Sequence, residues 1–116
     1  MIVSGSFPYL EVAFAVRGFE GKHLAYLDTG FDGFLIIPSG LASSLGDPDF
    51  VSRWELGDNS LTYGADYLGE ITVVGLAERM KGQVTCLGDE WMLGLGILNK
   101  FKVVFDHGRS IEVYEN

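Results

Sequence analysis

Alternation of apolar and polar residues is the clearest pattern in the first quarter of the chain. Every second residue from Leu10 to Val16 is a large apolar one, and the residues between them are polar or small. This period of two predicts a β-strand over residues 10–17 with one buried face. A turn over residues 18–21 and a second strand over 22–27 complete a predicted β-hairpin.

Short apolar runs bounded by turn residues predict the remaining strands. We expect these strands at residues 34–37, 53–56, 61–76, 83–87, 102–106 and 110–114. Gly64 and Gly69 interrupt the longest run, which predicts a bulged or bent strand. Turn signals recur every ~8–12 residues, and this spacing predicts an all-β fold, a small barrel or sandwich.

Two short helices are expected beside the strands. Ser39 is a suitable N-cap for a helix over residues 39–45, and Gly46 is placed to end it. The apolar segment 95–101 predicts the second helix, and the last two expected strands follow it as a terminal hairpin.

Length and charge exclude several classes of protein. The chain has 116 residues, which predicts one domain spanning residues 1–116, and its 47% apolar residues exclude a disordered chain. A net charge of −8 without any basic cluster argues against nucleic acid as a partner. No apolar run approaches the ~18 residues of a membrane span, and no signal peptide is recognisable, so no membrane partner is expected. A single cysteine fits a reducing compartment, so we expect a cytoplasmic protein.

The strongest candidate for chemistry is the triplet Asp28-Thr29-Gly30. A predicted apolar strand delivers a carboxylate directly into a turn that contains glycine, which suits an accessible carboxylate held by backbone hydrogen bonds. The triplet alone is more typical of an ordinary strand-to-turn boundary, because Asp and Gly favour turns.

Other reactive residues predict no further site. Cys86 lies in an expected strand and is interpreted as a buried small apolar residue. His23 and His107 have no metal-ligand spacing with each other or with Cys86, so neither a metal nor another cofactor is expected. A β-barrel that binds a small apolar ligand remains a further hypothesis, based on composition alone.

A second motif lies about sixty residues after the triplet. Met92-Leu93-Gly94 has two apolar residues and a glycine, and a short apolar segment ending at Leu98 follows. The order of triplet, glycine-interrupted hairpin, second motif and terminal hairpin resembles the retropepsin-like (clan AA) aspartic proteases over residues 10–114. The run that begins Asp-Thr-Gly-Phe looks most like a prokaryotic single-domain branch of this family. The resemblance implies a small closed acid-protease-like β-barrel with a flap hairpin and one or two short helices.

The resemblance also implies a function and a set of residues. It implies an aspartic endopeptidase in which a homodimer contributes two Asp28 carboxylates that activate a water, with a peptide or protein as substrate. Thr29 and Gly30 would complete the catalytic triplet. The residues implied to bind substrate are Phe31, Asp32 and Gly33 after the triplet and Gly57, Asp58, Asn59 and Ser60 at the flap turn.

Two departures from the family pattern keep an alternative open. Phe31 is bulky where the retroviral enzymes have a small residue, and Leu95 stands where the family has an arginine that pairs with the equivalent of Asp32. The alternative is a non-catalytic retropepsin-like module for dimerisation or peptide binding.

Overall fold

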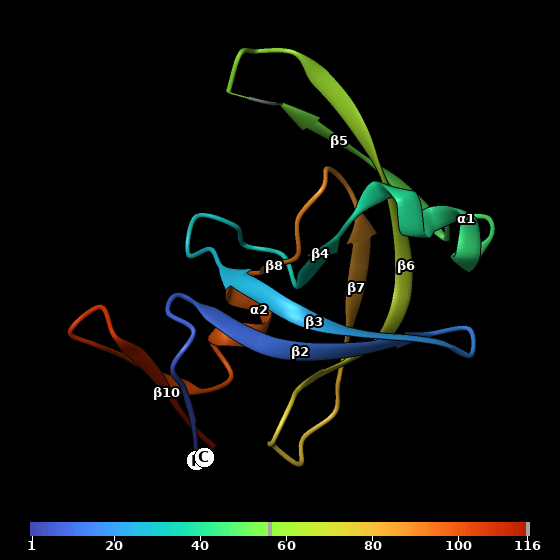
Figure 1. Ribbon diagram of the computed structural model, residues 1–116. Helices are drawn as coiled ribbons and strands as arrows, with labels where there is room; N and C mark the ends of the chain where they lie inside the picture. Colours follow the sequence, from blue (N-terminus) through green and yellow to red (C-terminus); the bar gives the residue numbers. More distant parts are fainter. Residues whose placement is uncertain (56, 116) are drawn as a thin grey trace.

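Short strands and a few helical turns make up the computed structural model, which describes residues 1–55 and 57–115 (Figure 1). The strands are β1 (Ile2–Ser4), β2 (Tyr9–Val16), β3 (Phe19–Leu27), β4 (Leu35–Ile37), β5 (Phe50–Glu55), β6 (Leu61–Val73), β7 (Met80–Cys86), β8 (Met92–Leu93), β9 (Lys102–Asp106) and β10 (Ser110–Tyr114). The helical elements are the 3₁₀ turn η1 (Ser39–Leu41), α1 (Ala42–Leu45) and α2 (Leu95–Leu98).

Most of the strands form one closed barrel. Seven strands pair in the order β2-β3-β8-β4-β7-β6-β5, and β6 also pairs with β2, so the ring closes and leaves β5 outside it. The predicted all-β barrel with a flap hairpin is therefore confirmed. The strand β5 and the first part of β6 form the long hairpin that projects from the barrel in Figure 1.

The hairpin β2–β3 follows the predicted alternation but has a tighter turn. Apolar residues of β2 are buried at every second position, as expected. Arg17 and Gly18 form the connection with φ of 50° and 82°, instead of the predicted turn over residues 18–21. Two positive φ angles are what a two-residue hairpin turn needs to match the strand twist.

The strand β6 curves along its length (Figure 1) but has no bulge, so of the predicted bulge or bend only the bend is present. Its register with β5 and β7 runs without an inserted residue. Gly69 is required for another reason: a Cβ there would lie 2.6 Å from the carbonyl oxygen of Ala15 on β2. Glycine thus allows β6 to approach β2 where the two strands close the barrel.

Several other predicted elements have different boundaries. The expected strand 53–56 begins earlier, at Phe50, and its last predicted residue, Leu56, lies outside the described residues. The expected strand 83–87 begins at Met80. Ser39 makes no side-chain capping bond, whereas Gly46 ends α1 with a φ of 82°, as predicted. The second helix, expected over 95–101, is shorter and ends at Leu98.

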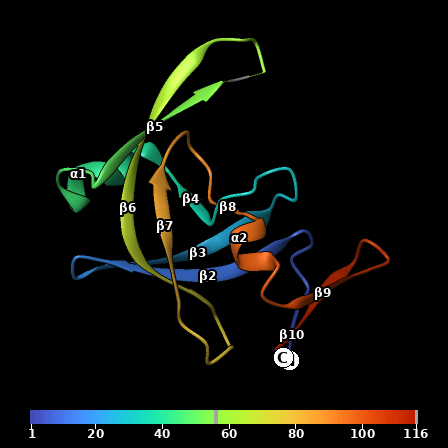
Figure 2. The same cartoon turned by 180° about the vertical axis from the view of Figure 1, so that it is seen from behind.

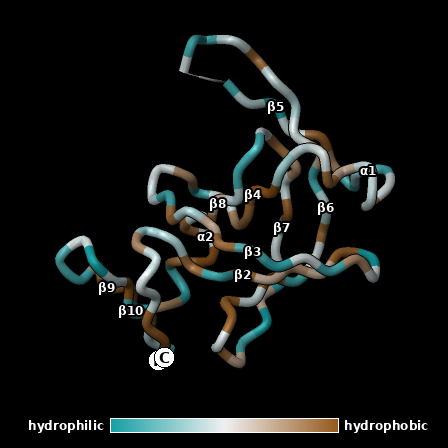
Figure 3. The backbone as a smooth tube through the Cα atoms, viewed as in Figure 1, coloured by the Kyte–Doolittle hydropathy of each residue, from teal (hydrophilic) through white to brown (hydrophobic). Residues whose placement is uncertain are grey.

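The apolar core fills the barrel. The strand β4 is buried at all three positions because it lies between β7 and β8. Figure 3 shows hydrophobic residues along this central part and hydrophilic ones near the tip of the β5–β6 hairpin. No helix among the described residues is long and apolar enough to cross a membrane.

A second sheet brings the two ends of the chain together. The hairpin β9–β10 has the predicted boundaries, and β1 adds to it in the order β1-β10-β9. The sequence did not predict β1, because three residues are too few to show a period of two. Its register pairs Ile2 with Val113.

Candidate active site

Asp28 lies at the end of β3, where the strand enters a loop over residues 28–34. The short strand β8 inserts between β3 and β4, running parallel to β3 and antiparallel to β4. The amide of Asp28 donates to the carbonyl of Leu93 at 3.0 Å. The Asp28 carboxylate oxygen Oδ1 accepts the amide of Gly30 at 2.9 Å. The strand end and the turn therefore both hold the position of this carboxylate.

The start of α2 holds the other half of the loop. The amides of Leu95 and Gly96 donate to the carbonyls of Phe31 and Gly33, each at 2.9 Å. Backbone hydrogen bonds on both flanks of the loop give it one defined conformation. The second sequence motif therefore acts as a support for the first.

Gly94 allows this close contact between the two motifs. A Cβ at Gly94 would lie 2.4 Å from the carbonyl oxygen of Gly33 and 2.8 Å from that of Phe31. Real Cβ atoms do not approach backbone oxygen so closely, so only glycine fits at this position.

The Asp28-Thr29-Gly30 triplet lies at the surface of the molecule. Asp28 is half-buried, and Thr29 and Gly30 are exposed. The loop, the β5–β6 hairpin and the β9–β10 turn extend to the same side of the barrel, as both Figure 1 and Figure 2 show. A second molecule can therefore approach the Asp28 carboxylate from this side.

Phe31 turns inward rather than toward solvent. Its side chain is 9% exposed, and its ring centroid lies 5.7 Å from that of Trp54 on β5. The ring also packs under Gly33, where a Cβ would meet it at 2.5 Å. Phe31 thus connects the Asp28 loop to the β5–β6 hairpin, at a residue close to its turn.

A cavity of about 190 Å³ opens beside Phe31. The structure brings three of the proposed substrate-binding residues together in its wall: Phe31, Asp32 and Gly33. The same wall includes Asp66 and Thr85, which were not among the predicted site residues. An acidic residue between the apolar residues Ala65 and Tyr67 of an expected strand is the signal that could have identified Asp66.

The flap turn does not line this cavity. The structure places Gly57, Asp58, Asn59 and Ser60 in the connection between β5 and β6. Both the amide and the hydroxyl of Ser60 donate to Asp58, and these hydrogen bonds lower the pKa of the Asp58 carboxyl. Asn59 has a φ of 65°, so the turn is tight. The four residues are thus gathered apart from Phe31, Asp32 and Gly33.

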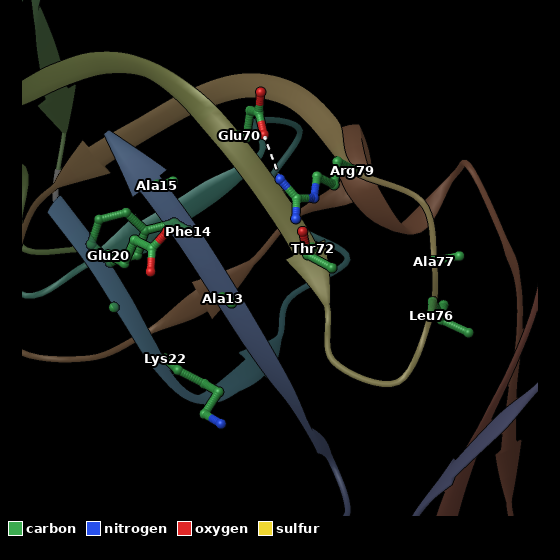
Figure 4. A pocket seen from close by; sticks show the side chains of 11 residues that line it. Ala13, Phe14, Ala15, Glu20, Lys22, Glu70, Thr72, Leu76, Ala77 and Arg79 are labelled. Carbon is green, nitrogen blue, oxygen red and sulfur yellow. Dashed lines mark ion pairs between the residues drawn. The ribbon is translucent and has the colours of Figure 1, made fainter. Parts of the chain in front are cut away.

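A larger hollow lies elsewhere on the barrel (Figure 4). It measures about 560 Å³ and lies over β2, β3 and β6, where Glu70 and Arg79 form an ion pair at 3.9 Å. None of the residues 28–34 lines it. The hollow is therefore separate from the Asp28 loop, although its volume is the larger of the two.

The other reactive side chains are occupied in packing or local contacts. Burial, and secondarily the charge of Asp66, raises the pKa of Cys86 to about 11, which keeps the thiol protonated. His23 stacks on Trp91, and His107 bonds to the neighbouring Asp106. Within residues 1–55 and 57–115, no group of three potential metal ligands is found.

Two solved structures with a similar fold are aspartic proteases. The crystal structure of a retropepsin-like aspartic protease from Rickettsia conorii matches with a TM-score of 0.56 and 19% identity. That match covers 97% of this chain and 90% of the rickettsial one. The solution structure of the simian foamy virus (mac) protease matches with a TM-score of 0.54 and 16% identity, over 78% of this chain and 91% of the viral one.

The comparisons of sequence do not assign this chain to a family. No family model matches the chain, and no curated protein matches it significantly. The chain therefore has the retropepsin-like fold on the basis of its structure.

Proposed function

We propose that this chain, which has the retropepsin-like fold, is one half of a homodimeric aspartic endopeptidase of the prokaryotic single-domain branch. The observation that carries the proposal is the Asp28 loop: an accessible carboxylate that accepts the Gly30 amide and is supported by β8 and α2. Asp-Thr-Gly occurs once in the chain. Two subunits related by a two-fold axis would supply the second carboxylate.

Two Asp28 carboxylates at a dimer axis would share one proton, because two adjacent like charges cannot both be ionised. The ionised carboxylate accepts a proton from water, and the water oxygen adds to the peptide carbonyl carbon. The protonated carboxylate donates to the carbonyl oxygen. When the C–N bond breaks, the nitrogen takes the proton that the first carboxylate gained from water and leaves as an amine, and a hydroxyl of the diol gives its proton to the second carboxylate, so that one shared proton remains. The backbone supports of the loop would hold each carboxylate in position throughout these steps.

A non-catalytic peptide-binding module on the same fold is the second candidate. One observation favours it: Asp32 is exposed, and no ion pair joins it to any residue that the structure describes. Leu95 stands at the helix start where a cation could have held it. The two candidates differ in one measurable property, because only the peptidase hydrolyses the peptide that it binds.

The direct test replaces the proposed catalytic carboxylate. A quenched-fluorescent library of random octapeptides serves as substrate between pH 4 and pH 7. We expect wild type to cleave the library and Asp28→Asn to lose cleavage while keeping its circular dichroism spectrum. Asp47→Asn removes the same charge from an exposed loop before β5 and is the matched control, which should remain active. Cleavage by Asp28→Asn would refute the assignment.

Mixing the two chains tests the shared site. If both carboxylates are needed, random pairing of wild type with an equal amount of Asp28→Asn lowers the activity of the wild-type chains to about half. A monomeric enzyme would keep its full activity on mixing. Sedimentation at the assay concentration shows independently whether the chain dimerises.

A further inference from the structure

Asp66 is a buried carboxylate with one unpartnered oxygen. It lies on β6 opposite Thr85 of β7, and its exposed fraction is 1%. The Thr85 hydroxyl donates to Oδ1 at 2.6 Å, whereas Oδ2 has no hydrogen-bond partner among the described residues. A buried carboxylate oxygen without a donor is unfavourable, so this atom points to a donor supplied from outside the chain.

The position of Asp66 directs it to the cavity beside Phe31. Successive residues of a strand face opposite sides. Tyr67, the next residue, faces the barrel side and donates its hydroxyl to the Gly46 carbonyl at 2.6 Å. Asp66 and Thr85 therefore share the opposite face, and both line the cavity of about 190 Å³. This volume is below the ~300 Å³ of small-molecule pockets and suits a single side chain.

The remaining walls determine the chemistry of the occupant. Phe31 and Trp54 provide aromatic surface, and the Trp54 Nε1 donor is already bonded to Ser52 at 2.7 Å. Aromatic surface accommodates an alkyl stem and attracts a cation. Asp32, which is exposed, adds a second carboxylate to the wall. The cavity thus combines aromatic surface with two carboxyl groups, and the polar side chains of Ser52, Gln83 and Thr85 complete its wall.

We propose that this cavity is a specificity pocket for a basic side chain of the peptide substrate, arginine or lysine, with Asp66 as the residue that binds its charged end. The inference rests on the proposed peptidase function, because Phe31 of the pocket wall directly follows the Asp28 triplet. The pocket would select peptides with a basic residue close to the cleaved bond, and it would reject acidic residues by repulsion.

The test uses full-length protein and octapeptide libraries in which one position at a time is held as arginine, lysine, citrulline, norleucine or glutamate. Citrulline has nearly the shape of arginine but carries no charge. We expect wild type to prefer arginine or lysine over citrulline and norleucine at one position, by roughly tenfold to a hundredfold in kcat/KM. Asp66→Asn should lose this preference, and the matched control Asp47→Asn should keep it.

Two results would overturn the proposal: a wild type that cleaves neutral and basic peptides equally at every position, or a preference that survives in Asp66→Asn. The first result needs no variant, so it stands even if Asp66→Asn does not fold.

A binding measurement separates this proposal from the peptidase proposal. Asp28→Asn labelled with ¹⁵N is titrated with N-acetyl-arginine methylamide and with its norleucine counterpart. Shifts of the Asp66 and Thr85 amides with the arginine compound alone support the pocket, even if wild type cleaves nothing. Equal responses to both compounds refute the pocket and leave the Asp28 assignment to its own test.

Discussion

Gly94→Ala is the substitution whose effect on stability the structure predicts most sharply, because it adds one carbon atom between the two motifs of the site. Gly94 has a φ of −102° and a ψ of 179°, which alanine adopts freely. The whole cost is therefore steric. The new Cβ would lie 2.4 Å from the Gly33 carbonyl oxygen and 2.5 Å from the Phe31 ring. The oxygen belongs to the backbone and cannot rotate away, so the Asp28 loop must move from α2.

The magnitude follows from two effects. Overpacking of a well-packed site costs about 1–3 kcal/mol. Movement of the loop also weakens the hydrogen bonds from Leu95 and Gly96, each of which contributes about 1 kcal/mol. Alanine also lowers the conformational entropy of the unfolded chain, which stabilises the folded variant by up to about 1 kcal/mol. We expect a net loss of about 2–4 kcal/mol in the free energy of unfolding.

Urea denaturation followed by circular dichroism measures this loss at one fixed protein concentration. With a slope of about 2 kcal/mol per molar urea, in the middle of the usual range, the midpoint should fall by about 1–2 M. Gly40→Ala is the matched control, since no atom lies within 4 Å of its added Cβ, and it should leave the midpoint unchanged or raise it slightly. Equal midpoints for Gly94→Ala and wild type would show that the loop does not rest on Gly94 as described.

Three further predictions concern single side chains. The amide of Leu68, followed by the side chain of Arg17, lowers the pKa of the Asp49 carboxyl from 3.8, so its ionised form stabilises the fold above that pH. The melting temperature of Asp49→Asn should thus lie below that of wild type at pH 6, and this gap should narrow as the pH falls below 3.8. A gap that stays constant at acid pH would refute the linkage. Cys86, with its pKa raised to about 11 and its side chain buried, should react with DTNB at pH 8 only after urea is added; rapid labelling of native protein would contradict this. Tyr67→Phe removes a hydroxyl that donates at 2.6 Å to the end of α1, and its urea midpoint should fall by the equivalent of about 1 kcal/mol, whereas an unchanged midpoint would show that the bond adds no stability.

Local patterns account for the parts of the fold that sequence reasoning predicted well. The alternation from Leu10 to Val16 identified both the strand β2 and its buried face. The boundaries of β9 and β10 were predicted exactly to the residue, because each strand is bounded by a clear turn signal. These properties depend on neighbours within a few residues, which the sequence displays directly.

The bulge or bend expected at Gly69 shows the limit of local reasoning. Within a strand, a glycine is typical both of a bulge and of a close approach by another backbone. Only the position of Ala15, more than fifty residues away in sequence, distinguishes the two. The short strands β1 and β8 were missed for a related reason, since their pairing partners are distant in the chain and they are too short to show a period of their own.

The same distinction between local and distant information applies to the candidate site. The sequence by itself identified the triplet at Asp28 and the second motif at Gly94, because both depend on a few adjacent residues. Only the tertiary structure decided that β8 inserts between β3 and β4 and supports the triplet, that Phe31 packs on Trp54, and that Asp66 is buried at a cavity. The physical reason is that closure of the barrel determines which distant residues share a face, and burial is a property of that closure rather than of any one segment.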